Sequence, residues 1–249
     1  VYTGNRPLQP ERSAVMFIHG AANDHSVWNL QSGYFAHHGR NVLAVDLPGH
    51  GRSDGKPLAS IAGIADWVPK LLDAAGVSQA ALAGHSMGAL AVLEAAARHP
   101  SRVRAIALLG VSVPMPVADA LLEAAKTNDH VALDMLNTWG HSSPAAANPN
   151  PGAWMPGEYL RLLERAAPGV LYNDLMACND YADGLGSAGK VRCPVLVIQA
   201  RHDLMTPLRN AKDLLAALPE VRCAILDDCG HCMMTEQPDR VLDTLIGFL

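Results

Sequence analysis

The sequence predicts an α/β fold: a mostly parallel sheet covered by helices on both faces, with one inserted helical segment. Short runs rich in Val, Ile, Leu and Ala alternate with helical patterns along most of the chain, as in parallel sheets with helical crossovers. These runs are apolar at most positions, which is typical of strands buried on both faces. With 249 residues, 49% of them apolar, the chain can bury a sizeable core.

The individual elements follow from local patterns. A helix is expected from Ile61 to Leu72, because apolar residues recur there at helical spacing and Ser60 is a suitable N-cap. Further helices are expected over residues 87–99, 208–218 and 239–249, and the first two stop at prolines. The predicted strands cover residues 14–18, 41–46, 79–83, 103–109, 194–199 and 222–226.

Residues 113–188 are predicted to form a helical cap inserted into the sheet domain, which comprises residues 1–112 and 189–249. Helical patterns occur in the insertion at residues 117–125 and 159–166, without a good strand pattern. Residues 142–157 contain four prolines and three consecutive alanines. We therefore expect that part of the cap to lack regular structure.

Composition excludes several classes of function. Lys and Arg number 19 against 24 Asp and Glu, and they form no basic cluster suited to nucleic acid. No apolar stretch reaches the ~18 residues of a membrane helix, and the first residues do not resemble a signal peptide. Five cysteines are too few for a disulfide scaffold. A cytoplasmic protein without nucleic-acid or membrane partners is expected, and its oligomeric state is not indicated.

The sequence Gly84-His85-Ser86-Met87-Gly88 lies between a predicted strand and a predicted helix, which is the setting of a nucleophile elbow. Small residues are needed two positions before and after the serine, because a Cβ atom there would strike neighbouring backbone. We predict that Ser86 is a nucleophile at the carboxyl edge of the sheet. The Met87 amide, at the helix N-terminus, is predicted to stabilise a developing oxyanion.

A serine nucleophile needs a base to take its proton and an acidic group to orient that base. Asp203 and His231 each follow a predicted strand, so both are expected at the same carboxyl edge. We predict that His231 is the general base and that Asp203 orients it. Asp227 and Asp228 are alternative orienting groups, but residues so near His231 in the chain rarely point back at its ring.

A second oxyanion donor is expected in the loop after the first strand. Gly20 allows the backbone to approach closely, and we assign the N–H of Ala21 as the donor, with Ala22 as the alternative.

Four further side chains are candidates for contact with substrate. They are His85, beside the nucleophile, and Trp139, His141 and Trp154 in the predicted cap, where such side chains commonly cover an acyl pocket.

Other motifs suggest different chemistry. Cys229-Gly230-His231-Cys232 has the C-x-x-C spacing of thiol oxidoreductases, but that motif normally opens a long helix after an early strand, and only 17 residues follow it in this chain. A lone C-x-x-C does not favour zinc. Residues 49–53 lack the third glycine of a dinucleotide fingerprint. No metal or cofactor is expected, and a redox role for the two cysteines stays open.

Five segments together resemble the α/β-hydrolase superfamily: His19-Gly20, residues 46–53, residues 84–88, His202-Asp203 and Gly230-His231. The match covers nearly the whole chain outside the predicted cap. The resemblance implies the α/β-hydrolase fold with an inserted helical cap. It also implies a serine-dependent branch, such as carboxylesterases, monoacylglycerol lipases, lactonases or carbon–carbon hydrolases, because dehalogenases and epoxide hydrolases have aspartate where Ser86 stands.

The expected function is therefore hydrolysis of carboxylic esters of small to medium acyl chain, through an acyl-enzyme on Ser86 and without a cofactor. The same triad would serve a carbon–carbon bond hydrolase or an enol-lactonase, and the sequence does not choose among them. Two alternatives come from other classes. One is a slow-turnover ligand-binding receptor, and the other is a thiol oxidoreductase that depends on Cys229 and Cys232.

Overall fold

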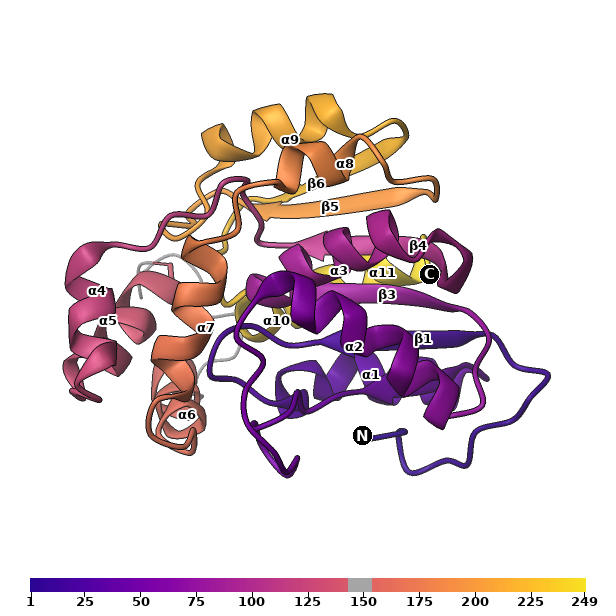
Figure 1. The fold of residues 1–249 in the computed structure, drawn as a ribbon, viewed down its shortest axis with the longest axis horizontal. Helices are drawn as coiled ribbons and strands as arrows, with labels where there is room; N and C mark the ends of the chain where they lie inside the picture. The colour runs from indigo at the N-terminus through magenta and orange to yellow at the C-terminus, as the bar shows by residue number, and fades with distance from the viewer. Residues whose placement is uncertain (143–153) are drawn as a thin grey trace.

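A sheet of six parallel strands runs through the part of the chain that the computed structural model describes, residues 1–142 and 154–249. The strand order is β2-β1-β3-β4-β5-β6 (Figure 1), which confirms the predicted parallel sheet. The strands are β1 (Ala14–Ile18), β2 (Asn41–Ala44), β3 (Ala80–His85), β4 (Val103–Leu109), β5 (Val195–Ala200) and β6 (Val221–Leu226).

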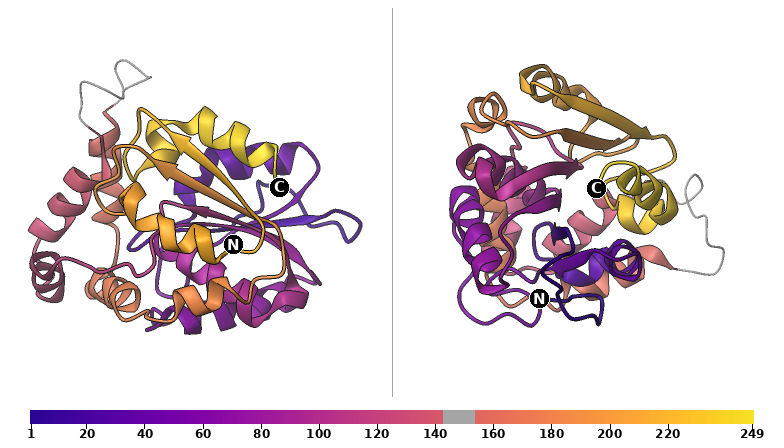
Figure 2. Two further views of the ribbon diagram at one scale, coloured as in Figure 1. Left: turned by 90° about the horizontal axis from the view of Figure 1, so that it is seen from above. Right: turned by 90° about the vertical axis from the view of Figure 1, so that its right-hand side faces the viewer.

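Helices cover both faces of this sheet. The flanking helices are α1 (Asn29–His37), α2 (Ile61–Ala74), α3 (Met87–Arg98), α8 (Gly184–Ala188), α9 (Lys212–Ala217), α10 (Met233–Glu236) and α11 (Pro238–Ile246). One apolar core lies between the sheet and α2, α3, α8 and α9, and a second lies between the sheet and α1 and α11. The right-hand view of Figure 2 shows the two groups on opposite sides of the strands. This double cover explains why β1 and β4 are buried along almost their whole length.

The remaining helices gather beyond one end of the sheet, at the left of Figure 1. They are α4 (Asp119–Lys126), α5 (Val131–Gly140), α6 (Met155–Leu163) and α7 (Val170–Asn179). These four helices share an apolar cluster that includes Leu121, Leu136, Leu163 and Leu175. Ala22, from the loop after β1, packs into the same cluster. These four helices, called the cap helices below, thus have a core of their own, which also contacts the loop after β1.

Helix α8 lies inside the segment predicted as cap but packs with the helices that flank the sheet. The buried carboxylate of Glu94 in α3 accepts hydrogen bonds from the Tyr181 hydroxyl at 2.7 Å and the Ser187 hydroxyl at 2.6 Å. Ala188 belongs to the core under α2 and α3. The chain after α7 is therefore already attached to the sheet domain before β5 begins.

The element predictions were accurate where the pattern was strongly periodic. Ser60 caps α2 as predicted, because its side chain accepts from the Gly63 N–H at 3.1 Å. Helix α1 was not predicted, since its buried residues include Gln31 and Ser32 while Leu30 is exposed, so no apolar stripe marks it.

Two further cap helices, α5 and α7, were also not predicted from the sequence. The proline-rich prediction for residues 142–157 lies mostly outside the described residues. Its described end was wrong, because Met155 to Gly157 form the first turn of α6, where a proline is tolerated. Within residues 1–142 and 154–249, no helix combines the length and the apolar character needed to cross a membrane.

Candidate active site

Ser86 occupies the sharp turn between β3 and α3. Its φ of +54° and ψ of −117° belong to a region that residues with side chains rarely adopt. The backbone holds this conformation from both sides: the Ser86 N–H donates to the Leu109 carbonyl at 2.9 Å, and its carbonyl accepts from the Ala89 N–H at 2.9 Å. The side chain is thereby fixed at the start of α3.

The glycines on either side of Ser86 are required by the backbone around them. A Cβ atom on Gly84 would lie 2.2 Å from the carbonyl oxygen of Gly88, and one on Gly88 would lie 2.4 Å from that of Ile18. Both distances are far inside van der Waals contact with backbone atoms, which cannot move aside as a flexible side chain can. The spacing of the motif therefore reports a real packing constraint.

Asp203 and His231 come together at the carboxyl ends of β5 and β6. The Nδ1 of His231 donates to Oδ2 of Asp203 at 2.8 Å, and both side chains are buried. The other carboxylate oxygen, Oδ1, accepts from the N–H groups of Met205 and Thr206 at 2.8 and 2.7 Å, and the Thr206 hydroxyl donates to Oδ2. Burial raises the pKa of Asp203, but the charge and hydrogen bonds of His231 and Thr206 lower it much more. Asp203 therefore stays ionised.

The other ring nitrogen of His231, Nε2, does not contact Asp203. Nε2 is buried and has no hydrogen-bond partner within residues 1–142 and 154–249. Ser86 and His231 both line one cavity. Because Asp203 fixes the proton on Nδ1, Nε2 carries the lone pair that can accept a proton.

The two alternative acids lie elsewhere. Asp227 is exposed and pairs with Arg201, with 2.6 Å between Oδ1 and the guanidinium. Asp228 offers its carbonyl to Gln237 at 3.0 Å. Neither contact involves the His231 ring.

Ala21 and Ala22, the two candidate oxyanion donors in the loop after β1, have different surroundings. Ala22 has a φ of +55°, and its N–H donates to Oδ2 of Asp174 at 2.9 Å. The Ala22 amide is thus already occupied, whereas Ala21 lines the cavity. This supports Ala21 over Ala22 as the second oxyanion donor. The Met87 N–H, at the first position of α3, belongs to the helical amides that lack an intrahelical partner.

Asp174 was not identified from the sequence, although it is the most buried acidic residue near this loop. It comes from cap helix α7, is 1% exposed, and accepts from His50 Nε2 at 2.8 Å as well as from Ala22. Burial lowers the pKa of His50, but the hydrogen bond and charge of Asp174 raise it further, so the net shift is upward. No local pattern marks Asp174, because its partners are 152 and 124 residues away.

His85 packs against His231. Its Nε2 donates to the carbonyl of His231 at 2.9 Å, and the two ring centroids are 4.6 Å apart. Burial, followed by the nearby charge of His231, lowers the pKa of His85 to about 3. The ring is therefore neutral, and Nδ1 is a hydrogen-bond acceptor without a partner among the described residues.

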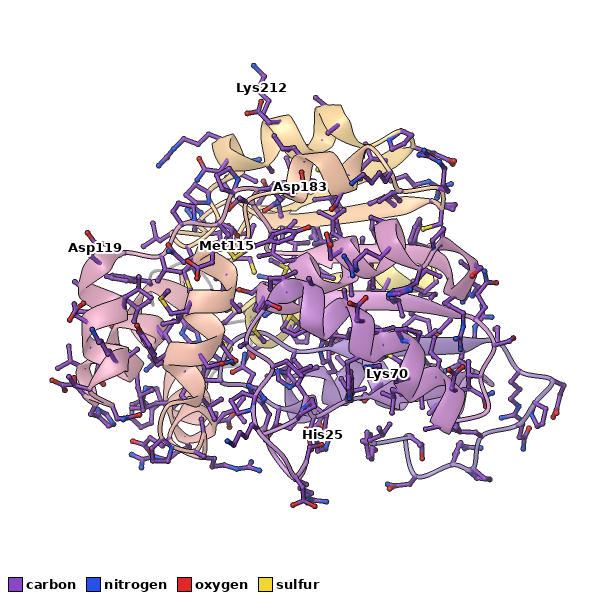
Figure 3. All side chains as sticks on the ribbon, viewed as in Figure 1. His25, Lys70, Met115, Asp119, Asp183 and Lys212 are labelled. Carbon is purple, nitrogen blue, oxygen red and sulfur yellow. The ribbon has the colours of Figure 1, made fainter. Side chains whose placement is uncertain are left out.

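The cavity above Ser86 has a volume of about 350 Å³. Figure 3 marks Met115, one of its lining residues, at the junction of the sheet and the cap. His85 and Trp139 line the cavity, as predicted for substrate contacts. Tyr159 of the cap also lines the cavity, whereas Asn23 was missed by the sequence reasoning, since an isolated polar residue carries no motif. The apolar wall on the cap side consists mainly of Met115, Val117, Leu121, Leu136, Trp139 and Leu175.

Trp154 and His141 do not line this cavity, contrary to the sequence-based expectation. The indole of Trp154 is 72% exposed and lies against Gly157 in the first turn of α6. His141 donates from Nδ1 to the carbonyl of Asn137 at 2.8 Å and packs edge-on against Tyr159. Both side chains are engaged by the cap itself.

The cysteines beside His231 are buried free thiols. Burial is the main cause that raises the pKa of both Cys229 and Cys232 far above the ordinary value. A thiol must become a thiolate to react, so these positions are unsuited to redox catalysis. The Cys232 N–H instead donates to the Gly140 carbonyl at 2.7 Å, which ties the His231 loop to the end of α5.

One group of side chains has the composition of a metal site but serves as a turn. Asp24, His25 and Asp46 bring their ligand atoms within 4.8 Å of one another among the described residues. Asp46 already accepts from the N–H and the ring of His25 and from the Arg52 N–H. The Arg52 contact closes the loop after β2, and the His25 contacts join that loop to the one after β1.

Comparison with known proteins agrees with this architecture. Residues 15–244 match the Alpha/beta hydrolase family. A pimeloyl-[acyl-carrier protein] methyl ester esterase from Aromatoleum aromaticum is 26% identical over 242 residues, which cover 92% of this chain and 94% of the relative. A 2-hydroxymuconate semialdehyde hydrolase from Pseudomonas putida is 27% identical over 271 residues, covering 100% of this chain and 91% of the relative.

Among solved structures, the enol-lactonase from Burkholderia xenovorans LB400 has the same fold. The two structures superpose with a TM-score of 0.85 at 22% identity, covering 96% of this chain and 91% of the other. The match over residues 15–244 places the chain in a family of hydrolases. The protein belongs to the α/β hydrolase family.

Proposed function

We propose that the protein is a serine hydrolase that cleaves carboxylic esters of small to medium acyl chain. The proposal rests on one observation, the surroundings of His231. Its Nδ1 is bound by Asp203 at 2.8 Å, its Nε2 has no partner among the described residues, and the residue lines the same cavity as Ser86. This is the arrangement in which a neutral imidazole can take a serine proton.

The reaction has two halves. In the first, Ser86 Oγ attacks the acyl carbon while its proton passes to His231 Nε2, and the N–H groups of Met87 and Ala21 bind the resulting oxyanion. His231 then gives that proton to the leaving alcohol, and the C–O bond breaks to leave an acyl group on Ser86. In the second half, His231 takes a proton from water, and the hydroxide attacks the acyl group. The acid leaves, and Ser86 recovers its proton.

The size of the cavity supports the substrate class. A volume of about 350 Å³ is at the lower end of the range for small-molecule sites. An apolar wall above the serine favours an acyl chain or an apolar alcohol over a polar one.

The direct test is labelling with a fluorophosphonate, followed by mass mapping of the modified residue. We expect one adduct on Ser86, absent in Ser86→Ala and strongly reduced in His231→Ala, because the base activates the serine. Cys229→Ser is the control and should label normally. An adduct on another residue, or labelling that survives Ser86→Ala, would exclude this mechanism.

Steady-state assays separate the remaining functions. Nitrophenyl esters, ring-cleavage diketones and enol-lactones assayed side by side distinguish the ester hydrolase from the two reactions that use the same triad. A burst of product without steady turnover would instead favour a slow ligand-binding receptor. Loss of activity in Cys229→Ser with full activity in Ser86→Ala would favour the thiol oxidoreductase.

A further inference from the structure

The described residues in the wall of the active-site cavity have no side chain that is ionised at neutral pH. None of the residues that line it within 1–142 and 154–249 is Lys, Arg, Asp or Glu. Residues 143–153 are Ser, Pro, Ala, Asn and Gly only, so they contain no charge that could be added to the wall. Whatever occupies the cavity therefore meets apolar groups, hydroxyls, an amide and imidazoles.

The two imidazoles in the wall do not supply a positive charge either. His231 must be neutral at Nε2 to take the proton of Ser86. His85 is held neutral by burial, with a pKa of about 3. Because its Nε2 donates to the His231 carbonyl, its Nδ1 presents a lone pair, and this atom has no partner among the described residues. Neither neutral ring therefore offers an ion pair to an anion in the cavity.

Two arginines of the cap are engaged elsewhere. Arg165 pairs with Asp24 at 3.2 Å and lines a separate small hollow. Arg161 pairs with Glu164 at 2.5 Å on the outer surface of α6. Neither lines the cavity above Ser86. A carboxylate bound in that cavity would thus lose its hydration without gaining an ion pair.

We infer that the substrate is an uncharged ester: the part that enters the cavity is an apolar chain without a free carboxylate or phosphate. This inference rests on the proposed function and narrows it. It selects esters of monocarboxylic acids, or esters whose distant acid group is itself masked, over esters of free dicarboxylic acids.

The test compares three p-nitrophenyl esters that differ only at the far end of the acyl chain. The hexanoate ends in methyl, the adipate half-ester ends in carboxylate, and the adipic monoamide ester ends in a neutral amide of the same shape. We expect kcat/KM for the carboxylate at pH 7.5 to be at least about 100-fold below the hexanoate, because an unpaired buried charge is strongly disfavoured. The amide should lie between them.

A charge-introducing variant sharpens this comparison. Val117 is half-buried in the cavity wall and belongs to no part of the catalytic machinery. Val117→Lys should raise kcat/KM for the adipate half-ester about fivefold to tenfold over the matched control Val117→Met. Each variant is also assayed with the hexanoate, and the effect of the charge is taken as the ratio of kcat/KM for the adipate half-ester to kcat/KM for the hexanoate.

The outcomes distinguish this inference from the proposed function. If wild type hydrolyses the carboxylate and methyl esters at similar kcat/KM, and Ser86→Ala abolishes both, the charge inference is overturned while serine catalysis stands. If none of the three esters is hydrolysed in a Ser86-dependent way, the proposed function itself fails. A carboxylate ester that is slow in wild type and accelerated by Val117→Lys supports the inference.

Discussion

The two walls of the cavity are built in opposite ways. On the sheet side, backbone hydrogen bonds fix the functional groups: Ser86 through its N–H to Leu109, and Asp203 through two amides. On the cap side, the wall consists of side chains such as Leu121 and Leu136, which contact the cavity only through apolar surface. Directional bonds position reacting atoms accurately, whereas apolar packing sets shape and polarity. The sheet side is thus suited to chemistry and the cap side to selection of substrate.

Asp174 makes a buried polar connection between the two walls. Asp174 on cap helix α7 holds the amide of Ala22 and the ring of His50, which both belong to loops of the sheet domain. Through Asp174 the cap thus holds the loop after β1, which contains the proposed oxyanion donor Ala21.

The largest effect is expected on the sheet side, at the nucleophile. Ser86→Ala should lower kcat for ester hydrolysis by at least about 10⁴-fold, because the members of a triad act as a unit. Ser112 is another buried serine, whose hydroxyl bonds to the Pro114 carbonyl, and Ser112→Ala is the matched control with near-normal kcat. An activity above a tenth of wild type in Ser86→Ala would break the assignment.

The next largest effect tests which acid orients His231. Asp203→Asn should lower kcat by roughly 10³- to 10⁴-fold, since an amide no longer fixes the productive tautomer. Asp227→Asn is the control, because Asp227 pairs with Arg201 at the surface. Equal losses in the two variants would contradict the assignment of Asp203 as the orienting acid.

Asp174 gives the sharpest test of the connection between the walls. Asp174→Ala leaves the Ala22 amide unpaired, and we expect kcat to fall about 10- to 100-fold with KM changed much less. Asp174→Asn retains an acceptor and should lose less. Asp183→Ala, at an exposed acid, controls for charge. A rise in KM at constant kcat would instead show that Asp174 acts only on binding.

The buried imidazoles predict how stability depends on pH. Burial lowers the pKa of His85 to about 3 and that of His19 to about 4. Below about pH 6.5 the unfolded chain therefore binds more protons than the folded chain. The free energy of unfolding decreases as the pH is lowered through this range. The pKa of His50 is raised by Asp174, so its contribution is complete below about pH 6.5 and is lost as pH rises through its folded pKa.

Stability should accordingly be greatest near pH 6.5. We expect the free energy of unfolding, from urea titrations, to fall by about 1 to 2 kcal/mol between pH 6.5 and 5. His85→Gln should weaken this dependence. A constant free energy of unfolding over that interval would contradict the neutral buried rings.

The smallest effect distinguishes the inner from the outer surface of the cap. Trp139→Ala removes part of the cavity wall and should raise KM for a hexanoate ester several-fold by lost apolar contact. Trp154→Ala removes a side chain that is 72% exposed and should leave KM unchanged. If both variants behaved alike, the cap side would not be organised as described.

Much of the sheet side follows from the sequence. The Ser86 elbow is local, because Gly84 and Gly88 are needed by atoms within a few residues or in the adjacent strand. Asp203 and His231 could be placed near Ser86 without coordinates, since the carboxyl ends of parallel strands share one edge. The observed strand ends differ from the predicted ones by at most two residues, and this difference changed none of these placements.

The cap side was decided by tertiary packing. Trp139 and Trp154 look equivalent in the sequence, yet one lines the cavity and the other is exposed, because the packing of α5 and α6 selects which face points inward. Asp174 meets Ala22 across 152 residues of chain. Constraints on local backbone geometry depend on residues that are close together in the chain, so the sequence by itself determined the elbow around Ser86. Contacts between distant helices depend on the summed packing of many apolar side chains, which only the folded structure decides.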